Sequence, residues 1–179
     1  TGIGLGRRKK IPDDYFTAYY EFSYQYYDVN EYAYFPIFNN GYANDLALKY
    51  VLQRSSVSAP IYPQSGSNIT FTAKSSLPYF LFNGNKDFTG LSDQEKYKYL
   101  EYYKLKFTGE WFFPLTKDKK LVLMSRFGFS YMGAYTASRG VTPFERFSLG
   151  GSGLSGVNQL GGREIIALRG YEDNTLSSS

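Results

Sequence analysis

The stretch FTAYYEFSYQY, residues 16–26, decides the fold of this chain. Its even-numbered positions are all apolar or aromatic, and its odd-numbered positions are mostly polar. Such an alternation of period two is typical of a β-strand with one apolar and one polar face. We therefore expect an amphipathic strand at residues 16–26.

Four further segments repeat this alternation, at residues 46–53, 69–77, 103–113 and 121–131. Residues 2–6 are expected to be the end of another strand. The segments run for about ten residues, whereas strands of soluble proteins usually have about 5–6. A tilted strand of about ten residues crosses the ~30 Å hydrocarbon layer of a membrane. The pattern predicts an all-β chain that forms the wall of an antiparallel transmembrane β-barrel, with a soluble β-sandwich as the alternative.

The amino-acid composition favours a membrane protein over an enzyme. Aromatic residues make up 20% of the 179 residues, and such rings gather at membrane–water interfaces. No apolar run approaches the ~20 residues of a membrane-spanning helix, so a membrane location requires β-strands. The lack of Cys and His removes thiolate metal sites and the commonest general base. The basic run RRKK at residues 7–10 is expected to form a solvated turn, with phosphate binding as the alternative.

The two faces of the expected wall carry different side chains. The polar positions hold charged residues that suit a water-filled lumen, namely Glu21, Lys49, Lys74, Lys104, Lys106, Glu110 and Arg126. Aromatic residues fall near the strand ends, where membrane interfaces are expected. Trp111 and Phe113 are predicted at the periplasmic end, and Tyr26, Tyr131 and Tyr135 toward the outer end.

The connections between the expected strands alternate between long and short. Residues 28–42 and 80–98 form long connections, whereas residues 56–66 and 114–119 form short ones. Bacterial outer-membrane barrels have longer loops outside and shorter turns in the periplasm, which predicts the side of each connection. Within the second long loop, the sequence SDQE has capping-box spacing and predicts a short helix at residues 93–99.

The 44 residues after Tyr135 contain no comparable amphipathic strand. Loops longer than about 15 residues are usually functional or disordered, and the segment REIIALRGY is too apolar for simple disorder. Such a loop can fold back into a lumen, where Arg169 pairs with wall carboxylates. Gly170 then allows a special backbone angle or a close approach to the wall. The alternative is a surface loop that binds a neighbouring protein.

Three stretches, in this order, carry a family resemblance: PIYPQSGS at residues 60–67, PFERFSLGGSG at 143–153 and LRGY at 168–171. Together they make the chain similar to the Omp85 family, and within it to the barrels of outer-membrane assembly factors. The resemblance implies a sixth extracellular loop approached through Pro143, Phe144, Phe147, Gly150 and Gly151, with Arg169, Gly170 and Tyr171 as its signature tip. Tyr171 stands where the family more often has Phe, and residues 156–167 are an insertion.

The resemblance also implies what the chain is part of. Residues 1–179 correspond to about strands 6–11 of a sixteen-stranded barrel plus the sixth loop, all within a single outer-membrane domain. The periplasmic POTRA repeats and the remaining strands are expected elsewhere in a larger protein, because five strands alone leave unpaired edges in lipid.

The implied function is a non-enzymatic insertase that folds β-barrel proteins into the bacterial outer membrane, without a cofactor or metal. Its implied partners are nascent barrel proteins, periplasmic and lipoprotein subunits of an assembly complex, and outer-membrane lipids, with no nucleic acid. A transporter that secretes one dedicated partner protein is the first alternative, followed by a porin or surface-binding barrel. An enzyme barrel is disfavoured, since no nucleophile and base can be paired without His.

Overall fold

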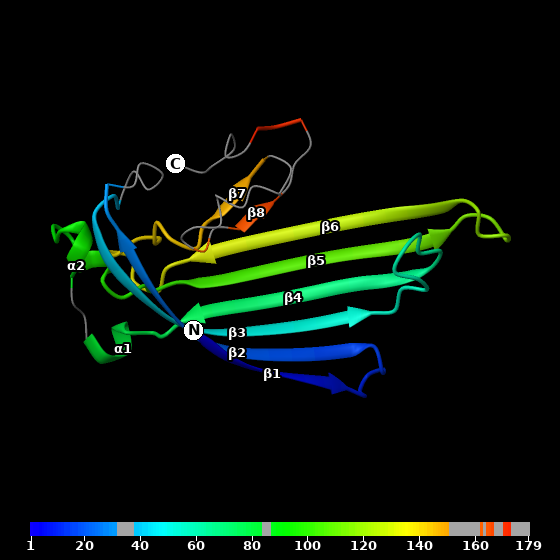
Figure 1. Cartoon of the computed structure of the whole chain (residues 1–179), viewed down its shortest axis with the longest axis horizontal. Coiled ribbons are helices and arrows are strands. Elements are labelled where there is room, and N and C mark those ends of the chain that lie inside the picture. The colour runs from blue at the N-terminus through cyan, green and yellow to red at the C-terminus, as the bar shows by residue number, and fades with distance from the viewer. Residues whose placement is uncertain (32–37, 84–86, 151–161, 163, 167–169, 173–179) are drawn as a thin grey trace. The chain divides into compact units, whose positions relative to one another are not determined.

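The computed structural model describes residues 1–31, 38–83, 87–150, 162, 164–166 and 170–172. Six strands form one sheet in chain order, as Figure 1 shows. They are β1 (Gly2–Lys9), β2 (Phe16–Val29), β3 (Gly41–Ser55), β4 (Gly66–Ser76), β5 (Tyr103–Pro114) and β6 (Val122–Gly133). The predicted all-β barrel segment is confirmed, and the sheet includes every strand that the alternation predicted.

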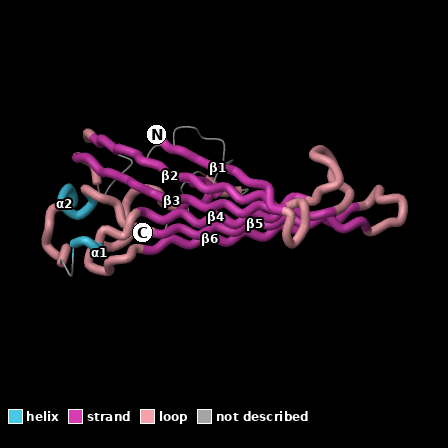
Figure 2. Tube along the Cα trace, turned by 90° about the horizontal axis from the view of Figure 1, so that it is seen from below, coloured by secondary structure: helices cyan, strands magenta, loops and turns pink. Residues whose placement is uncertain are grey.

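Antiparallel pairing holds neighbouring strands in register. β1 pairs with β2, β3 with β4 and β4 with β5 in this sense. Figure 2 shows the strands side by side, with the short helices placed in a connection. Tyr, Phe, Val, Ile and Thr dominate these strands, and such side chains favour an extended backbone.

The chain divides into two compact units. The first, which we call the wall unit, contains residues 1–24, 46–77 and 103–131. It includes the three short connections. The second, the loop unit, contains residues 25–45, 78–102 and 132–179, and therefore the long connections. The predicted alternation of long and short connections thus separates the chain into these two units.

The basic run at residues 7–10 was expected to form a turn, and this prediction is wrong. Strand β1 continues to Lys9, with Arg7, Arg8 and Lys9 opposite Ala18, Thr17 and Phe16 of β2. The turn begins only at Lys10. An antiparallel partner supplies backbone hydrogen bonds to every second residue, and this pairing outweighs the polar character of the side chains.

The loop unit contains short helices and a small second sheet. Helix α1 spans Phe80–Asn83 and α2 spans Asp93–Tyr97, slightly shorter than predicted. Ser92 is the N-cap of α2, since its Oγ accepts a hydrogen bond from the Glu95 backbone N–H, and it also donates to Glu95 Oε2. Strands β7 (Phe147–Leu149) and β8 (Glu164–Ile166) pair in parallel, which the sequence did not predict. Neither described helix has the length and apolarity to span a membrane.

Candidate functional site

The apolar face of the wall is exposed. Large hydrophobic side chains on alternate strand positions reach exposures from 36% for Phe71 to 80% for Ile3. Directly opposite residues of antiparallel strands share a face, and the pairs Ile3–Phe22, Leu5–Tyr20 and Phe71–Phe107 therefore belong to one continuous surface. Its exposed members are Ile3, Leu5, Tyr20, Phe22, Tyr24, Leu48, Phe71, Phe113, Leu123, Phe127, Phe129 and Tyr131. A patch of this size and regularity suits contact with lipid.

The opposite face carries the seven charged residues that were predicted to line a lumen. Lys49 lies directly opposite Lys74, and Lys74 lies directly opposite Lys104, so one row across three strands holds three lysines. Glu21 at the adjacent strand pairs with Lys49, with 3.4 Å between Nζ and Oε2. Like charges directly opposite each other destabilise a sheet, so the carboxylate of Glu21 offsets part of the repulsion.

The remaining charged positions follow the same face. Lys106 lies opposite Thr72, and Glu110 lies opposite Asn68. Arg126 of β6 forms an ion pair with Glu110, with 2.6 Å between Nη2 and Oε1. The seven residues predicted to line a lumen therefore share the polar face of the sheet.

The aromatic residues predicted at interfaces lie near strand ends. Trp111 of β5 places its ring over Gly109, where an added Cβ would come within 2.7 Å of Trp111 Cζ3. Phe113 is half exposed at the same end of β5. Near the opposite ends, Tyr26 stacks on Tyr42 at 6.2 Å, and Tyr131 lies 6.0 Å from Tyr103.

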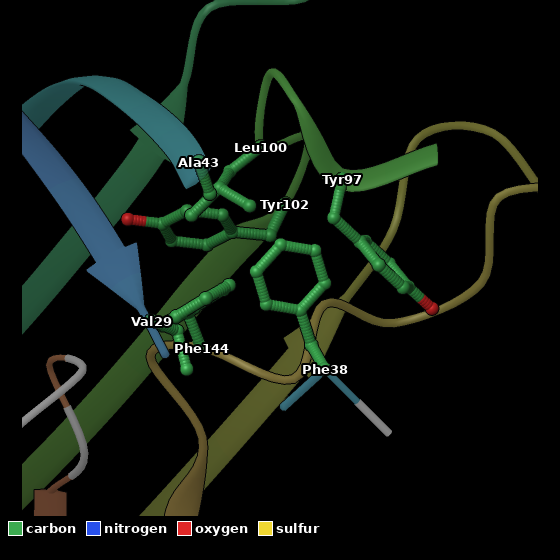
Figure 3. Packing of buried hydrophobic residues seen from close by; sticks show 7 residues of the cluster. All are labelled: Val29, Phe38, Ala43, Tyr97, Leu100, Tyr102 and Phe144. Carbon is green, nitrogen blue, oxygen red and sulfur yellow. The ribbon is translucent and has the colours of Figure 1, made fainter. Parts of the chain in front are cut away.

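The loop unit has a hydrophobic core of its own. Figure 3 shows the buried side chains gathered at one place, which are Val29, Phe38, Ala43, Tyr97, Leu100, Tyr102 and Phe144. Phe144 is fully buried and stacks on Tyr27 at 4.6 Å, while Phe38 meets it edge-on at 5.3 Å. Pro143 beside it is buried as well. The approach segment is thus anchored by its aromatic residue in this core.

Residues 92–100 form hydrogen bonds with the first residues of β3. The Gln94 side chain both donates to and accepts from the backbone of Tyr42, and the backbone of Asn44 bridges to Lys98 and Leu100. Gly41 makes room for this contact, since an added Cβ would lie 2.9 Å from Gln94 Cδ. Within the loop unit, the connection between β4 and β5 therefore pairs with the start of β3.

A buried ion pair joins two connections of the loop unit. Arg139 Nη1 lies 3.4 Å from Glu101 Oε1, and the side chains are 4% and 0% exposed. Arg139 also donates to the Tyr99 carbonyl at 2.7 Å and covers the Phe88 ring at 4.1 Å. Thr136 donates to the second oxygen of Glu101. Burial lowers the pKa of Arg139, and the nearby Glu101 opposes this shift.

Glu145 occupies an unusual position in the approach segment. It is 4% exposed, has a left-handed φ of 62°, and accepts a hydrogen bond from Tyr27 at 3.2 Å. Gly162 packs against it, since an added Cβ would lie 3.1 Å from Glu145 Cγ and closer still to the carboxylate. Strained backbone angles cluster in functional segments, which makes Glu145 a candidate functional residue. Its neighbours Phe144 and Phe147 were predicted from the sequence as approach residues, but Glu145 was not.

Tyr102 is bound to a second buried carboxylate. Its hydroxyl donates to Asp45 Oδ2 at 2.8 Å. Burial raises the pKa of Tyr102 well above its ordinary value, and the charges of Glu145 and Asp45 add to this effect. The neutral hydroxyl is therefore strongly favoured in the folded loop unit.

We expect Tyr102→Phe to lower the free energy of unfolding by about 1.5–3 kcal/mol, because a buried hydrogen bond to a charged group is lost. The raised pKa also sets a pH dependence. The stabilisation is complete below the unfolded pKa of about 10 and decreases as pH rises above it. Urea unfolding of the full-length protein between pH 8 and 11 should show a weaker alkaline decline in the variant. Tyr99→Phe, an exposed neighbour, is the control, and equal effects of both changes would contradict the assignment.

The structure describes only part of the predicted signature tip. Arg169 of the tip lies outside the described residues, as does Gly151 of the approach segment. Gly170 has a φ of 86°, which fits the expected special backbone angle, but no described atom lies within 4 Å of an added Cβ. Tyr171 is half exposed. The described part thus supports the backbone requirement at Gly170 and shows no close approach.

The other two approach residues lie at the small sheet. Phe147 begins β7 and is half-buried, while Gly150 follows it, buried and with a φ of 121°. The Gly150 N–H donates to the Ile166 carbonyl at 3.2 Å, which ties the approach segment to β8.

Comparisons with known proteins identify the type of barrel. The family model described as the Omp85 superfamily domain matches residues 1–179. A comparison with curated proteins found no match. Among solved structures, the chain is similar to BamA from Haemophilus ducreyi lacking POTRA domains 1–3, with a TM-score of 0.65 and 17% identity. The match covers 99% of this chain and 30% of that one, so the chain spans under a third of the solved structure's length.

Proposed function

The chain belongs to the Omp85 superfamily, and from this premise we propose that its parent protein folds and inserts β-barrel proteins into the bacterial outer membrane. The family match over the whole chain is the observation that carries this proposal. The likeness to BamA supports the fold of a barrel segment, and the motifs that resemble outer-membrane assembly factors support the insertase role. The exposed apolar face of the wall agrees with a location in a membrane.

The proposed mechanism uses no enzymatic step and no cofactor. A client strand adds to an exposed strand edge of the parent barrel, so that backbone hydrogen bonds template its folding. Closing these bonds and burying apolar strand faces in lipid supply the free energy. As the family resemblance implies, this lateral gate would lie between the first and last strands of the barrel, outside residues 1–179. The segment described here then supplies the wall away from the gate and the sixth loop.

The proposed partners follow from this role. They are nascent outer-membrane β-barrel proteins, periplasmic and lipoprotein subunits of an assembly complex, and outer-membrane lipids. The long connections face the cell surface in this proposal, and the short ones face the periplasm.

Depletion of the full-length parent protein, followed by quantitative outer-membrane proteomics, tests the function. We expect many unrelated barrel proteins to fall together. Loss of one secreted protein with other barrels intact would instead identify a dedicated transporter. Unchanged levels of both, with reduced uptake of small solutes, would identify a porin.

The signature tip provides a residue-level test. We expect Arg169→Ala to reduce assembly of client barrels, because in this proposal its guanidinium pairs with lumen carboxylates. Arg169→Lys should restore activity only in part, since Lys lacks the planar fork that binds a carboxylate through two hydrogen bonds. Client assembly and the gel mobility of the unheated protein are the measurements. Lys119→Ala, in the exposed β5–β6 turn, is the control, and wild-type behaviour of the Arg169 variants would contradict the role.

A further inference from the structure

Because Arg7, Arg8 and Lys9 lie in β1, their side chains alternate between the two faces of the sheet. Arg7 and Lys9 lie opposite Ala18 and Phe16 in the register of β1 and β2. They therefore share the face of Ile3 and Leu5, which belong to the exposed apolar surface of the wall. Two cations thus continue the membrane-facing row of β1 toward its β2 turn.

Two arginines at this end of the wall unit, Arg8 and Arg54, have partners within the chain. Arg8, on the opposite face of β1, donates to the Asp14 carbonyl at 2.8 Å. Arg54 lies 2.8 Å from Asp13 Oδ2 and also donates to the Ser56 and Ser67 hydroxyls. Arg7 and Lys9 are exposed, and within the described part of the chain they form no hydrogen bond or ion pair. Their charges therefore remain available to an external anion.

The short connections and their flanking strand ends carry the positive charge of the chain. Residues 7–15, 54–66 and 114–121 contain eight basic and three acidic residues, a net charge of +5. The whole chain has +4, so all other segments together are slightly acidic. This end of the wall unit is electrostatically complementary to an anionic surface.

Aromatic side chains accompany the two cations on the same face. Phe16 lies directly opposite Lys9, and the Arg54 guanidinium lies 5.9 Å from the Phe16 ring and 5.6 Å from the Tyr15 ring. Farther along the sheet, Trp111 and Phe113 occupy the corresponding end of β5. Aromatic rings and long cationic side chains together mark the level of lipid head groups, where the charged end extends to phosphate and the stem stays in apolar surroundings.

From this arrangement we infer that Arg7 and Lys9 form a binding site for the phosphate groups of anionic phospholipids. Residues two apart on one strand face lie about 7 Å from each other, a spacing that allows two neighbouring head groups or the two sides of one phosphate. The apolar positions Ile3 and Leu5 contact the acyl chains of the same lipids. The inference rests on the proposed membrane location, and it does not require the insertase activity.

Titration of phosphatidylglycerol into the full-length parent protein in neutral detergent, followed by native mass spectrometry, tests the site. Phosphatidylcholine is the reference lipid. We expect selective retention of phosphatidylglycerol, and about thirtyfold weaker binding in the Arg7→Gln/Lys9→Gln variant, from about 1 kcal/mol for each cation near an anionic surface. The matched control is Lys117→Gln/Lys119→Gln, which removes the same charge from the exposed β5–β6 turn. It should weaken binding clearly less than the Arg7/Lys9 change, because Arg7 and Lys9 share the strand face of Ile3 and Leu5.

Other outcomes are distinguishable. Equal retention of both lipids by the wild-type protein, or unchanged phosphatidylglycerol binding in the Arg7/Lys9 variant, overturns the site. Loss of an acidic protein subunit from the purified complex with lipid binding intact would assign the surface to a protein instead. If the double variant does not fold, the salt dependence of wild-type binding decides, since ionic binding must weaken between 0.05 and 0.5 M NaCl. Client assembly measured in parallel separates a failure of this site from a failure of the proposed function.

Discussion

Replacing Arg139 by leucine is expected to lower the free energy of unfolding of the parent barrel by about 3–5 kcal/mol. The change leaves the Glu101 carboxylate buried without its cation, and it also removes the hydrogen bond to the Tyr99 carbonyl. Removing one partner of a buried ion pair costs far more than the pair itself contributes, because an uncompensated charge stays out of water. Urea unfolding of the full-length protein in lipid vesicles is the measurement.

Two variants control this prediction. Arg126→Leu breaks the ion pair with Glu110, but 69% of the Arg126 side chain is exposed, so we expect a loss below about 1 kcal/mol. Glu101→Met combined with Arg139→Leu removes both charges and should recover most of the stability. Equal effects of Arg139→Leu and Arg126→Leu would show that the buried position of Arg139 has no energetic importance.

The second large effect is expected for Gly66→Ala at the start of β4. Gly66 has a φ of 104°, and an added Cβ would lie 2.9 Å from Val57 Cα and even closer to the Ser56 carbonyl. Backbone atoms cannot move aside as a flexible side chain can. We expect a loss of about 2–5 kcal/mol from backbone strain and overpacking together. Thermal unfolding, followed by the gel mobility of the unheated protein, measures it.

Gly90→Ala separates the two contributions. Gly90 has a φ of 83°, but nothing lies within 4 Å of an added Cβ. This variant should therefore lose only the ~1–2 kcal/mol that a left-handed backbone costs an L-residue. If Gly66→Ala and Gly90→Ala lower the stability equally, the close approach of the Ser56 carbonyl to Gly66 does not add to the cost of the substitution.

The strands of the wall could be predicted from the sequence because each has one apolar face. A one-residue shift would move every side chain to the other face, so the alternation specifies the strands strongly. The strand ends were less predictable. β2 continues to Val29 and β3 begins at Gly41, outside the alternating segments, because Val29 and Ala43 pack into the loop core. That core forms only when loops that are distant in the sequence pack together, so no local sequence pattern predicts it.

The basic run shows a different limit of sequence analysis. Four consecutive cations suggested a turn, but the segment extends a strand whose partner begins at Phe16. The turn requires only residues 10–15, where Pro12, Asp13 and Asp14 supply suitable turn chemistry. Pro12, Asp13 and Asp14 are therefore a stronger turn signal than the preceding run of charges.

Some of the site residues could be predicted from the sequence and others could not. Motif resemblance identified Phe144, which is buried in the loop core, and the polar alternation identified the charged face of the wall. Neither signal could identify the buried charged residues Asp45, Glu101, Arg139 and Glu145, since acidic and basic residues in loops are usually exposed. Two signals were present: Glu101 lies in an aromatic run, and Glu145 lies between two phenylalanines of the approach segment.

Because the loop unit has its own hydrophobic core, the stability of its loops depends on water, whereas that of the wall depends on lipid in the proposed membrane. Water drives the aromatic rings of Phe38, Tyr102 and Phe144 together, and exposing them on unfolding raises the heat capacity. The wall, in its proposed membrane, depends instead on the match between its apolar band and the thickness of the hydrocarbon. Temperature and urea should therefore act on the loops as on a small water-soluble domain, while acyl-chain length acts on the wall. Surface loops can change their sequence under the demands of water while the strands remain adapted to lipid.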